Sequence, residues 1–313
     1  MNCTTRRWAY FGLTLCLALV AGCDSLPKVG HRPTIYNPFP QLQQVAVLPF
    51  FNQSNEPTVD GLRIAELYQT ELQKIRGFTV MPVGVVEQYL LENEVSIDQG
   101  LDFQQLARDL GVDVLVVGSI TDFSPYNPPR MGLAINWYAA NPGFHPIPAG
   151  YGLPWGTSEE EFIPDELVWA AEFELAKEQL KTQQPGSSSE LVPPAPGAET
   201  IEPGIELGLP AAWPDPQGFI PPAPMAKRPP RRIYRGPLIE QVRQYDAADT
   251  DLLTKLQTYY HWQQDTRTGG WRGYLQRSED FTRFCCYLHL SEMLAARGGV
   301  DQSALVLDLS HDR

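Results

Sequence analysis

The sequence predicts an α/β domain, because short apolar segments alternate with segments of helical periodicity. The first apolar segment, 45–51, is bounded by turn-forming residues, which is typical of a buried strand. The helical pattern that follows it ends at Gly77. A later segment, 112–123, is apolar on both faces up to Gly118, which predicts a central strand in a sheet covered by helices.

The remaining elements of this domain are predicted from the same two periodicities. We expect further strands at 78–83, 131–139 and 167–175, and a helix at 85–92. In 167–175 the prediction depends on the alternation of Trp169, Ala171 and Phe173. Another helix is expected to begin after Asp102, as its N-cap, and to end at Gly111.

The amino terminus has the pattern of an export signal. Arg6 and Arg7 precede an apolar segment, 8–20, which is followed by small residues and Cys23. The apolar segment is shorter than the roughly 20 residues that span a bilayer comfortably. Val20-Ala21-Gly22-Cys23 resembles the lipobox of bacterial lipoproteins, in which the cysteine is acylated and becomes the first residue. The alternative, an ordinary signal peptide with a chance cysteine, fits this arrangement less well.

The resemblance to lipoproteins implies a location. A lipid on Cys23 would hold the protein at a membrane of the cell envelope, facing the periplasm, because each buried methylene adds roughly 0.8 kcal/mol. The sequence leaves both the inner and the outer membrane open.

Composition divides the chain into five parts. Proline clusters within 178–232, which predicts disorder there. After it a helical pattern returns, which predicts a helix over 246–262 and another helix capped by Ser278. The expected parts are a signal peptide (1–22), a tether without packed structure (23–40), the α/β domain (41–177), a Pro-rich disordered linker (178–232) and a helical segment that packs back on the domain (233–313).

Charge and motifs exclude several classes of function. The net charge of -13 argues against nucleic acid as a partner, since a phosphate backbone needs a basic surface. The five histidines are scattered without the spacing of metal ligands, and the sequence contains no nucleotide-binding or hydrolase motif. Cys285 and Cys286 point about 100° apart on a helix, so we expect at least one to lie in the core. We therefore predict no enzyme activity, cofactor or metal.

Three segments together resemble a known superfamily. They are VAVLPFFNQS at 45–54, DGLRIAELYQTELQKIRGFTVMPV at 60–83 and LARDLGVDVLVVGSITDFSPY at 106–126. They are similar to the envelope-lipoprotein superfamily that includes CsgG, LpoB and the amino-terminal domain of TolB. This resemblance implies an anticodon-binding-like fold, with helices on a mixed sheet, and a domain that binds proteins or assembles with itself.

The predicted function is therefore that of a lipid-anchored assembly or accessory factor. Its expected partners are a membrane, through the acyl anchor, and an envelope protein, and a homo-oligomer is also compatible with the resemblance. One alternative is a secretion channel of the curli type, although proline and glycine interrupt the segments after Met131 that would have to span a bilayer. Another is a cell-wall-binding module that uses the basic cluster 227–235.

Overall fold

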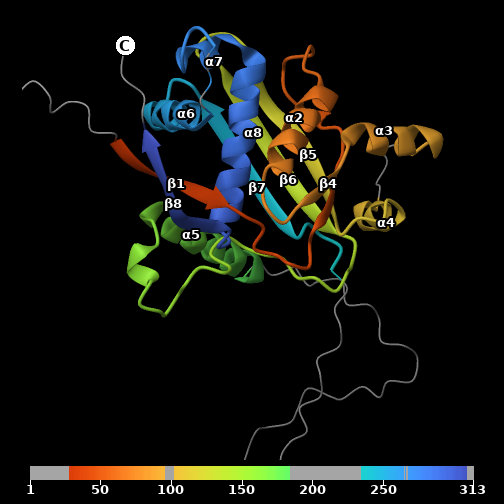
Figure 1. Ribbon diagram of the computed structural model, residues 1–313. Coiled ribbons are helices and arrows are strands. Elements are labelled where there is room, and N and C mark those ends of the chain that lie inside the picture. Colours follow the sequence, from red (N-terminus) through yellow and green to blue (C-terminus); the bar gives the residue numbers. More distant parts are fainter. Residues whose placement is uncertain (1–27, 96–101, 184–233, 264, 266, 309–313) are drawn as a thin grey trace, which may run out of the picture.

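The computed structural model describes residues 28–95, 102–183, 234–263, 265 and 267–308. The main sheet has the strand order β4-β2-β5-β6-β7, with β3 also paired to β5 (Figure 1). Pairs among β2, β3, β4 and β5 are parallel, whereas β5–β6 and β6–β7 are antiparallel. The prediction of an α/β fold with a mixed sheet is confirmed. The strands are β2 (Gln44–Val47), β3 (Phe51–Asn52), β4 (Thr79–Met81), β5 (Val114–Ser124), β6 (Arg130–Ala139) and β7 (Ile239–Asp246).

Strand β5 lies in the middle of the sheet, as its apolar sequence predicts. Its side chains alternate between two cores: Val114 and Val116 face one, and Leu115 and Val117 face the other. Because both faces of its first half are buried, the continuous apolar sequence is what a central strand requires.

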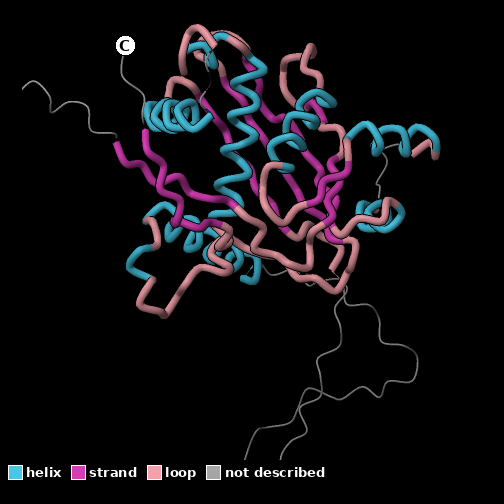
Figure 2. The backbone as a smooth tube through the Cα atoms, in the orientation of Figure 1, coloured by secondary structure: helices cyan, strands magenta, loops and turns pink. Residues whose placement is uncertain are grey.

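Helices cover both faces of the sheet. On the larger core lie α2 (Gly61–Gln73) and α8 (Ser278–Ala295), which run side by side (Figure 2). On the smaller core lie α3 (Val83–Glu92) and α4 (Phe103–Asp109). Asp102 caps α4 as expected, because its carboxylate accepts hydrogen bonds from the backbone N–H groups of Gln104 and Gln105.

The Pro-Phe corner after β2 explains two glycines of the sequence pattern. The ring of Phe50 lies over Gly118, where an added Cβ would come within 2.5 Å of the ring. The Phe50 backbone also meets the start of α2 so closely that a Cβ on Gly61 would collide with its carbonyl oxygen. Glycine is needed at both positions for close approach.

The segment expected to be an unstructured tether is partly folded. Strand β1 (Lys28–Ile35) pairs in antiparallel fashion with β8 (Val300–Asp308), and the two form a separate ribbon (Figure 1). Phe39 lies in the core. The prediction of no packed structure over 23–40 is therefore wrong for 28–40, because a strand at the far end of the chain supplies a partner that local composition does not reveal.

The predicted strand at 167–175 is also wrong. These residues belong to a helix, α5 (Asp165–Gln183), which follows a single 3₁₀ turn, η1 (Glu160–Phe162). The alternation of Trp169 and Phe173 with polar residues suits both periods, since these two aromatics are also four residues apart on one helix face. The helix also extends to Gln183, past the predicted start of the linker at 178.

The carboxy-terminal part contains the expected helices and two strands that were not expected. Helix α6 (Thr250–Gln263) and α8 match the prediction, and α7 (Arg272–Gln276) lies between them. Ser278 is the first residue of α8 rather than its cap: the N-cap position is Arg277, with no side-chain capping hydrogen bond. Strands β7 and β8 flank these helices, so the segment is not purely helical.

The predicted signal peptide and most of the predicted linker lie outside the described residues. Within the described ranges, no helix combines the length and apolar character needed to cross a membrane.

Candidate functional site

The predicted lipidation site, Cys23, lies outside the described residues, so acylation there stays a prediction. Strand β1 begins at Lys28, five residues further along the chain. A fully extended chain covers at most about 3.5 Å per residue, so five residues span no more than about 17 Å. A lipid on Cys23 would therefore hold the ribbon near the membrane surface.

An apolar groove opens beside this ribbon. Its volume is about 930 Å³, and its walls come from the end of β1, the loop and turn over 152–164, α5, α6, α8 and the start of β8. The apolar lining includes Ile35, Leu153, Ile163, Leu167, Phe284 and Leu288. Grooves of this size lined mainly by apolar side chains bind apolar ligands or the apolar face of a partner segment.

Charged groups lie at one side of this groove. The Lys255 ammonium is 3.1 Å from Glu292 Oε1 and 4.0 Å from Glu166 Oε2. Glu292 also forms an ion pair with Arg243, whose Nε lies 3.4 Å from Glu292 Oε2. These side chains are partly exposed, so the pairs add little stability and can exchange partners. They give the groove a polar rim.

The interior between α2, α8 and the sheet holds several buried polar side chains. One Glu71 oxygen is 2.6 Å from Lys74 Nζ, and the other has no hydrogen-bond partner among the described residues. Burial raises the pKa of Glu71, against the pull of Lys74. The pKa of His289 falls to about 4, mainly because burial disfavours its charged form. These groups lie in closed packing rather than at an accessible surface.

Both cysteines of α8 are buried and free. The prediction that at least one faces the core is confirmed. Burial raises the pKa of each thiol, so neither is a thiolate at neutral pH. Their chemistry is that of small apolar core residues.

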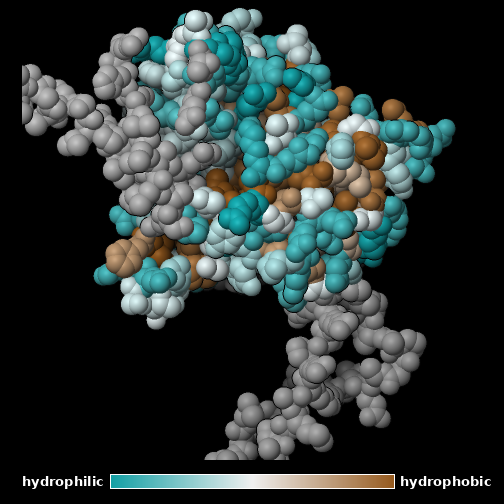
Figure 3. All heavy atoms as spheres, in the orientation of Figure 1, coloured by the Kyte–Doolittle hydropathy of each residue, from teal (hydrophilic) through white to brown (hydrophobic). Residues whose placement is uncertain are grey.

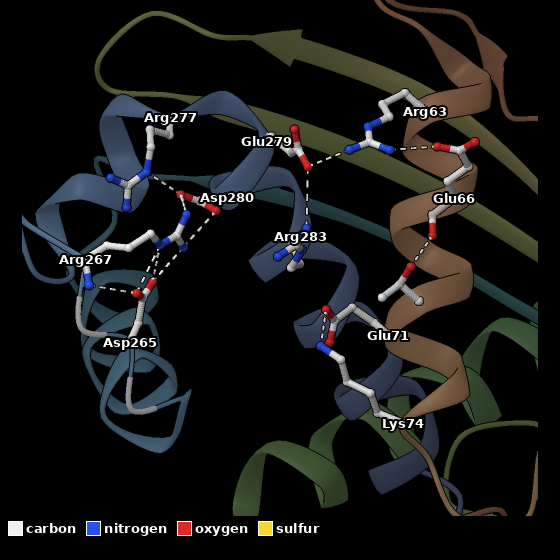
Figure 4. Close-up of polar contacts among 11 residues, drawn as sticks. Arg63, Glu66, Glu71, Lys74, Asp265, Arg267, Arg277, Glu279, Asp280 and Arg283 are labelled. Carbon is white, nitrogen blue, oxygen red and sulfur yellow. Dashed lines mark hydrogen bonds and ion pairs between the residues drawn. The ribbon is translucent and has the colours of Figure 1, made fainter.

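An ion-pair cluster fixes the junction of α7 and α8 (Figure 4). The buried carboxylate of Asp280 forms ion pairs with both Arg277 and Arg267, and Arg267 Nη1 lies 3.1 Å from Asp280 Oδ2. Arg267 also pairs with Asp265 at 2.6 Å, and its hydrogen bond lowers the pKa of that carboxyl. Both carboxylates are already occupied by guanidinium groups, and Tyr274 donates a further hydrogen bond to Asp265. The cluster acts as a structural clamp.

The described histidines do not converge. His289 lies in the core, whereas His145 and His261 are exposed on separate elements. Among the residues that the structure describes, no three His, Cys, Asp or Glu side chains gather as a metal site would require. His31 and His311 have no described side chain.

Sequence reasoning missed the groove, because its walls come from segments far apart in the chain. A signal for the surface next to it was nevertheless present. Trp169, Phe173, Ala176 and Leu180 follow the i, i+4, i+7, i+11 spacing of one helix face. A strand assignment conceals this stripe.

No family model and no curated protein matches this chain. Solved structures that are similar in part include the lipoprotein GNA1162 from Neisseria meningitidis, at 16% identity and a TM-score of 0.27 over 31% of this chain and 69% of that one. The LpoB C-terminal domain from Escherichia coli is 14% identical, with a TM-score of 0.24 over 32% of this chain and 75% of that one.

A further similar structure is a PelC dodecamer from Paraburkholderia phytofirmans. It is 14% identical, with a TM-score of 0.21 over 36% of this chain and 71% of that one. Likenesses of this size do not establish a shared function.

Proposed function

We propose that the chain is a lipid-anchored envelope protein that acts as an assembly or accessory factor by binding a protein partner, without catalysing a reaction. The observation that carries this proposal is the apolar groove between the ribbon, α5, α6 and α8. Lys255, Glu166 and Glu292 form ion pairs at its rim, and most of its lining is aliphatic or aromatic. Such a surface suits the apolar side chains of a partner segment.

The lipobox-like sequence supports the location in this proposal. Cys23 would carry the acyl anchor, and the four residues 24–27 leave little slack before β1. Partners would therefore be proteins of the same membrane surface. Replacing Cys23 with Ala should move the protein from the membrane fraction to the soluble fraction, and continued membrane retention of that variant would overturn the anchor.

The groove is tested with two matched substitutions. Thr254 lines the groove on α6, and Thr70 lies on α2, away from it. Both are exposed helical threonines whose hydroxyl donates to the carbonyl four residues earlier, at 3.0 and 2.8 Å. Thr254→Arg places a long charged side chain in the groove, whereas Thr70→Arg makes the same change elsewhere.

The measurement is the recovery of co-purified protein from solubilised envelopes. We expect T254R to lose a partner that the parent protein and T70R both retain. An apolar contact of a few buried side chains contributes about 1.5–3 kcal/mol each, so the loss should exceed tenfold. Equal recovery by the two variants would contradict the proposal.

A further inference from the structure

Helix α5 presents an apolar stripe that faces away from the body of the protein. Trp169 and Phe173 are 69% and 57% exposed, and Leu180 further along the same face is 65% exposed. The two aromatic rings stack, with centroids 5.8 Å apart and planes 14° from parallel. Figure 3 shows apolar surface in the lower left, where η1 and the start of α5 lie in Figure 1. An exposed stripe of this kind marks an interaction surface.

This stripe is a different surface from the groove. The opposite side of α5 packs on the body of the protein. There Ala171 lies so close to Gly150 that a Cβ added to Gly150 would come within 2.7 Å of the Ala171 Cβ. Leu167, on that inner side, lines the groove. Residues four and seven apart lie on one face of a helix, so the stripe points the other way.

The charge beside the stripe limits what can cover it. Exposed Glu166 and Glu172 flank Trp169 and Phe173, and α5 as a whole carries five acidic residues and two lysines in its sequence. An anionic lipid surface attracts basic segments and repels such a helix. Two copies of α5 meeting through the same face would bring their carboxylates together, which is destabilising.

The chain itself contains a segment of complementary chemistry. Residues 220–232 read IPPAPMAKRPPRR, with five prolines and with Lys227, Arg228, Arg231 and Arg232. Proline-rich segments bind to aromatic-lined surfaces because their extended helix is already formed and little entropy is lost. Basic side chains next to the prolines would pair with the flanking glutamates.

The connections allow the segment to reach α5. The segment 184–233 leaves from the end of α5 at Gln183 and returns at Tyr234. Tyr234 donates its backbone N–H to Pro142, and Leu238 accepts from Ile147, in the loop that leads to Gly150 under α5. The returning end is therefore held at the loop that leads to Gly150 under α5. Because the segment is joined to the fold at both ends, its contact with α5 would be intramolecular, which raises its local concentration and favours a weak contact.

We propose that residues 220–232 dock in cis on the Trp169–Phe173–Leu180 stripe of α5. The prolines contact the stacked rings, and the basic residues pair with Glu166 and Glu172. Glu166 also lies at the rim of the groove, but Trp169, Glu172 and Phe173 do not line it, so the two proposals can fail separately.

The test uses site-specific photo-crosslinking in the full chain. A benzoylphenylalanine at Ala176, an exposed position on the stripe, is irradiated in the detergent-extracted protein, and the linked peptides are identified by mass spectrometry. We expect links to residues 220–232 within a monomer. The same probe at Leu91, which is 73% exposed on α3, should give no such link.

Charge substitutions sharpen this test. Replacing Lys227, Arg228, Arg231 and Arg232 with Gln should lower the yield at least threefold, since exposed ion pairs contribute up to about 1 kcal/mol each. An unchanged urea midpoint shows that this variant is folded. Links from Ala176 to a second copy, to lipid, to other segments or to nothing would each overturn the proposal, as would an unchanged yield in the Gln variant.

Discussion

Helices α5 and α8 have similar lengths but opposite surroundings. Helix α8 crosses the sheet beside α2 and buries both of its phenylalanines and its sulfur-containing side chains, among them Phe281, Phe284 and Cys286. None of the described side chains of α5 is fully buried, although it carries Trp169 and Phe173. Most apolar residues on α8 therefore stabilise the fold, and Phe284 and Leu288 also line the groove, whereas Trp169 and Phe173 on α5 stay exposed to solvent. The proposed binding surfaces therefore lie on the α5 side of the molecule.

The largest expected effect separates these two helices directly. Phe281 is 2% exposed and Phe173 is 57% exposed, so Phe281→Ala and Phe173→Ala remove the same atoms from opposite environments. Phe281→Ala should lower the free energy of unfolding by about 3–5 kcal/mol, because it leaves a cavity. Phe173→Ala should cost about 1 kcal/mol or less. Urea denaturation measures both, and equal costs would break the comparison.

A second effect depends on pH and belongs to the interior beneath α8. The pKa of His289 is about 4 in the folded protein, against 6.5 for an unperturbed histidine. The unfolded chain thus binds more protons between these values, so stability falls as the pH drops through this window. The shift corresponds to roughly 3 kcal/mol, lost in full only below about pH 4.

Comparison with a variant isolates this contribution from that of Glu71. Because burial raises the pKa of Glu71, its protonation in the folded state adds stability as the pH falls, which opposes the histidine effect. In His289→Gln, the free energy of unfolding should decline less between pH 7 and pH 4 than in the parent protein. Parallel declines would show that His289 is not buried in its neutral form.

The clamp at the start of α8 gives a smaller effect. Asp280→Asn removes the charge that Arg267 and Arg277 share. Because both guanidinium groups are partly exposed, we expect a cost of about 1–2 kcal/mol rather than the cost of a fully buried pair. Thermal unfolding monitored by circular dichroism measures it. If Asp280→Asn left the main thermal unfolding transition unchanged and lost helical structure only at α7, a role of Asp280 in positioning α8 would be contradicted.

The smallest effect comes from the exposed pair that joins α2 to α8. Arg63 lies 2.8 Å from both Glu66 and Glu279, and all three side chains are about half exposed (Figure 4). Arg63→Gln should change the free energy of unfolding by less than about 1 kcal/mol. The change should shrink further in 1 M salt, where charges are screened within about 3 Å. A larger, salt-independent cost would mean that this link contributes to the core.

Much of the sheet could be predicted from local pattern, and the failures share one cause. The strand over 112–123 and the cap at Asp102 depend on neighbouring residues, so sequence was sufficient. Strands β1 and β8 pair across almost the whole chain, and their sequences contain no local sign of the partner. Strand β7 is an edge strand in which only Ile239 and Tyr245 are buried, so it lacks the apolar pattern on which the predictions depended.

The groove could not have been predicted for the same reason. Its walls join Ile35, the loop near Leu153, α6 and α8, which only the folded chain brings together. Cys23 is the opposite case: a short local motif predicts its chemistry, and the described residues do not include it. The candidate anchor thus comes from sequence and the candidate binding surface from structure.

The most direct test is photo-crosslinking in intact cells from two matched positions. A benzoylphenylalanine at Thr254, in the groove, should link the protein to a discrete envelope protein. The same probe at Thr70, which lies on α2 and does not line the groove, should not capture that partner. Loss of the Thr254 link when Cys23 is replaced by Ala would tie binding to membrane attachment. Identical products from the two positions, or none from Thr254, would contradict the account.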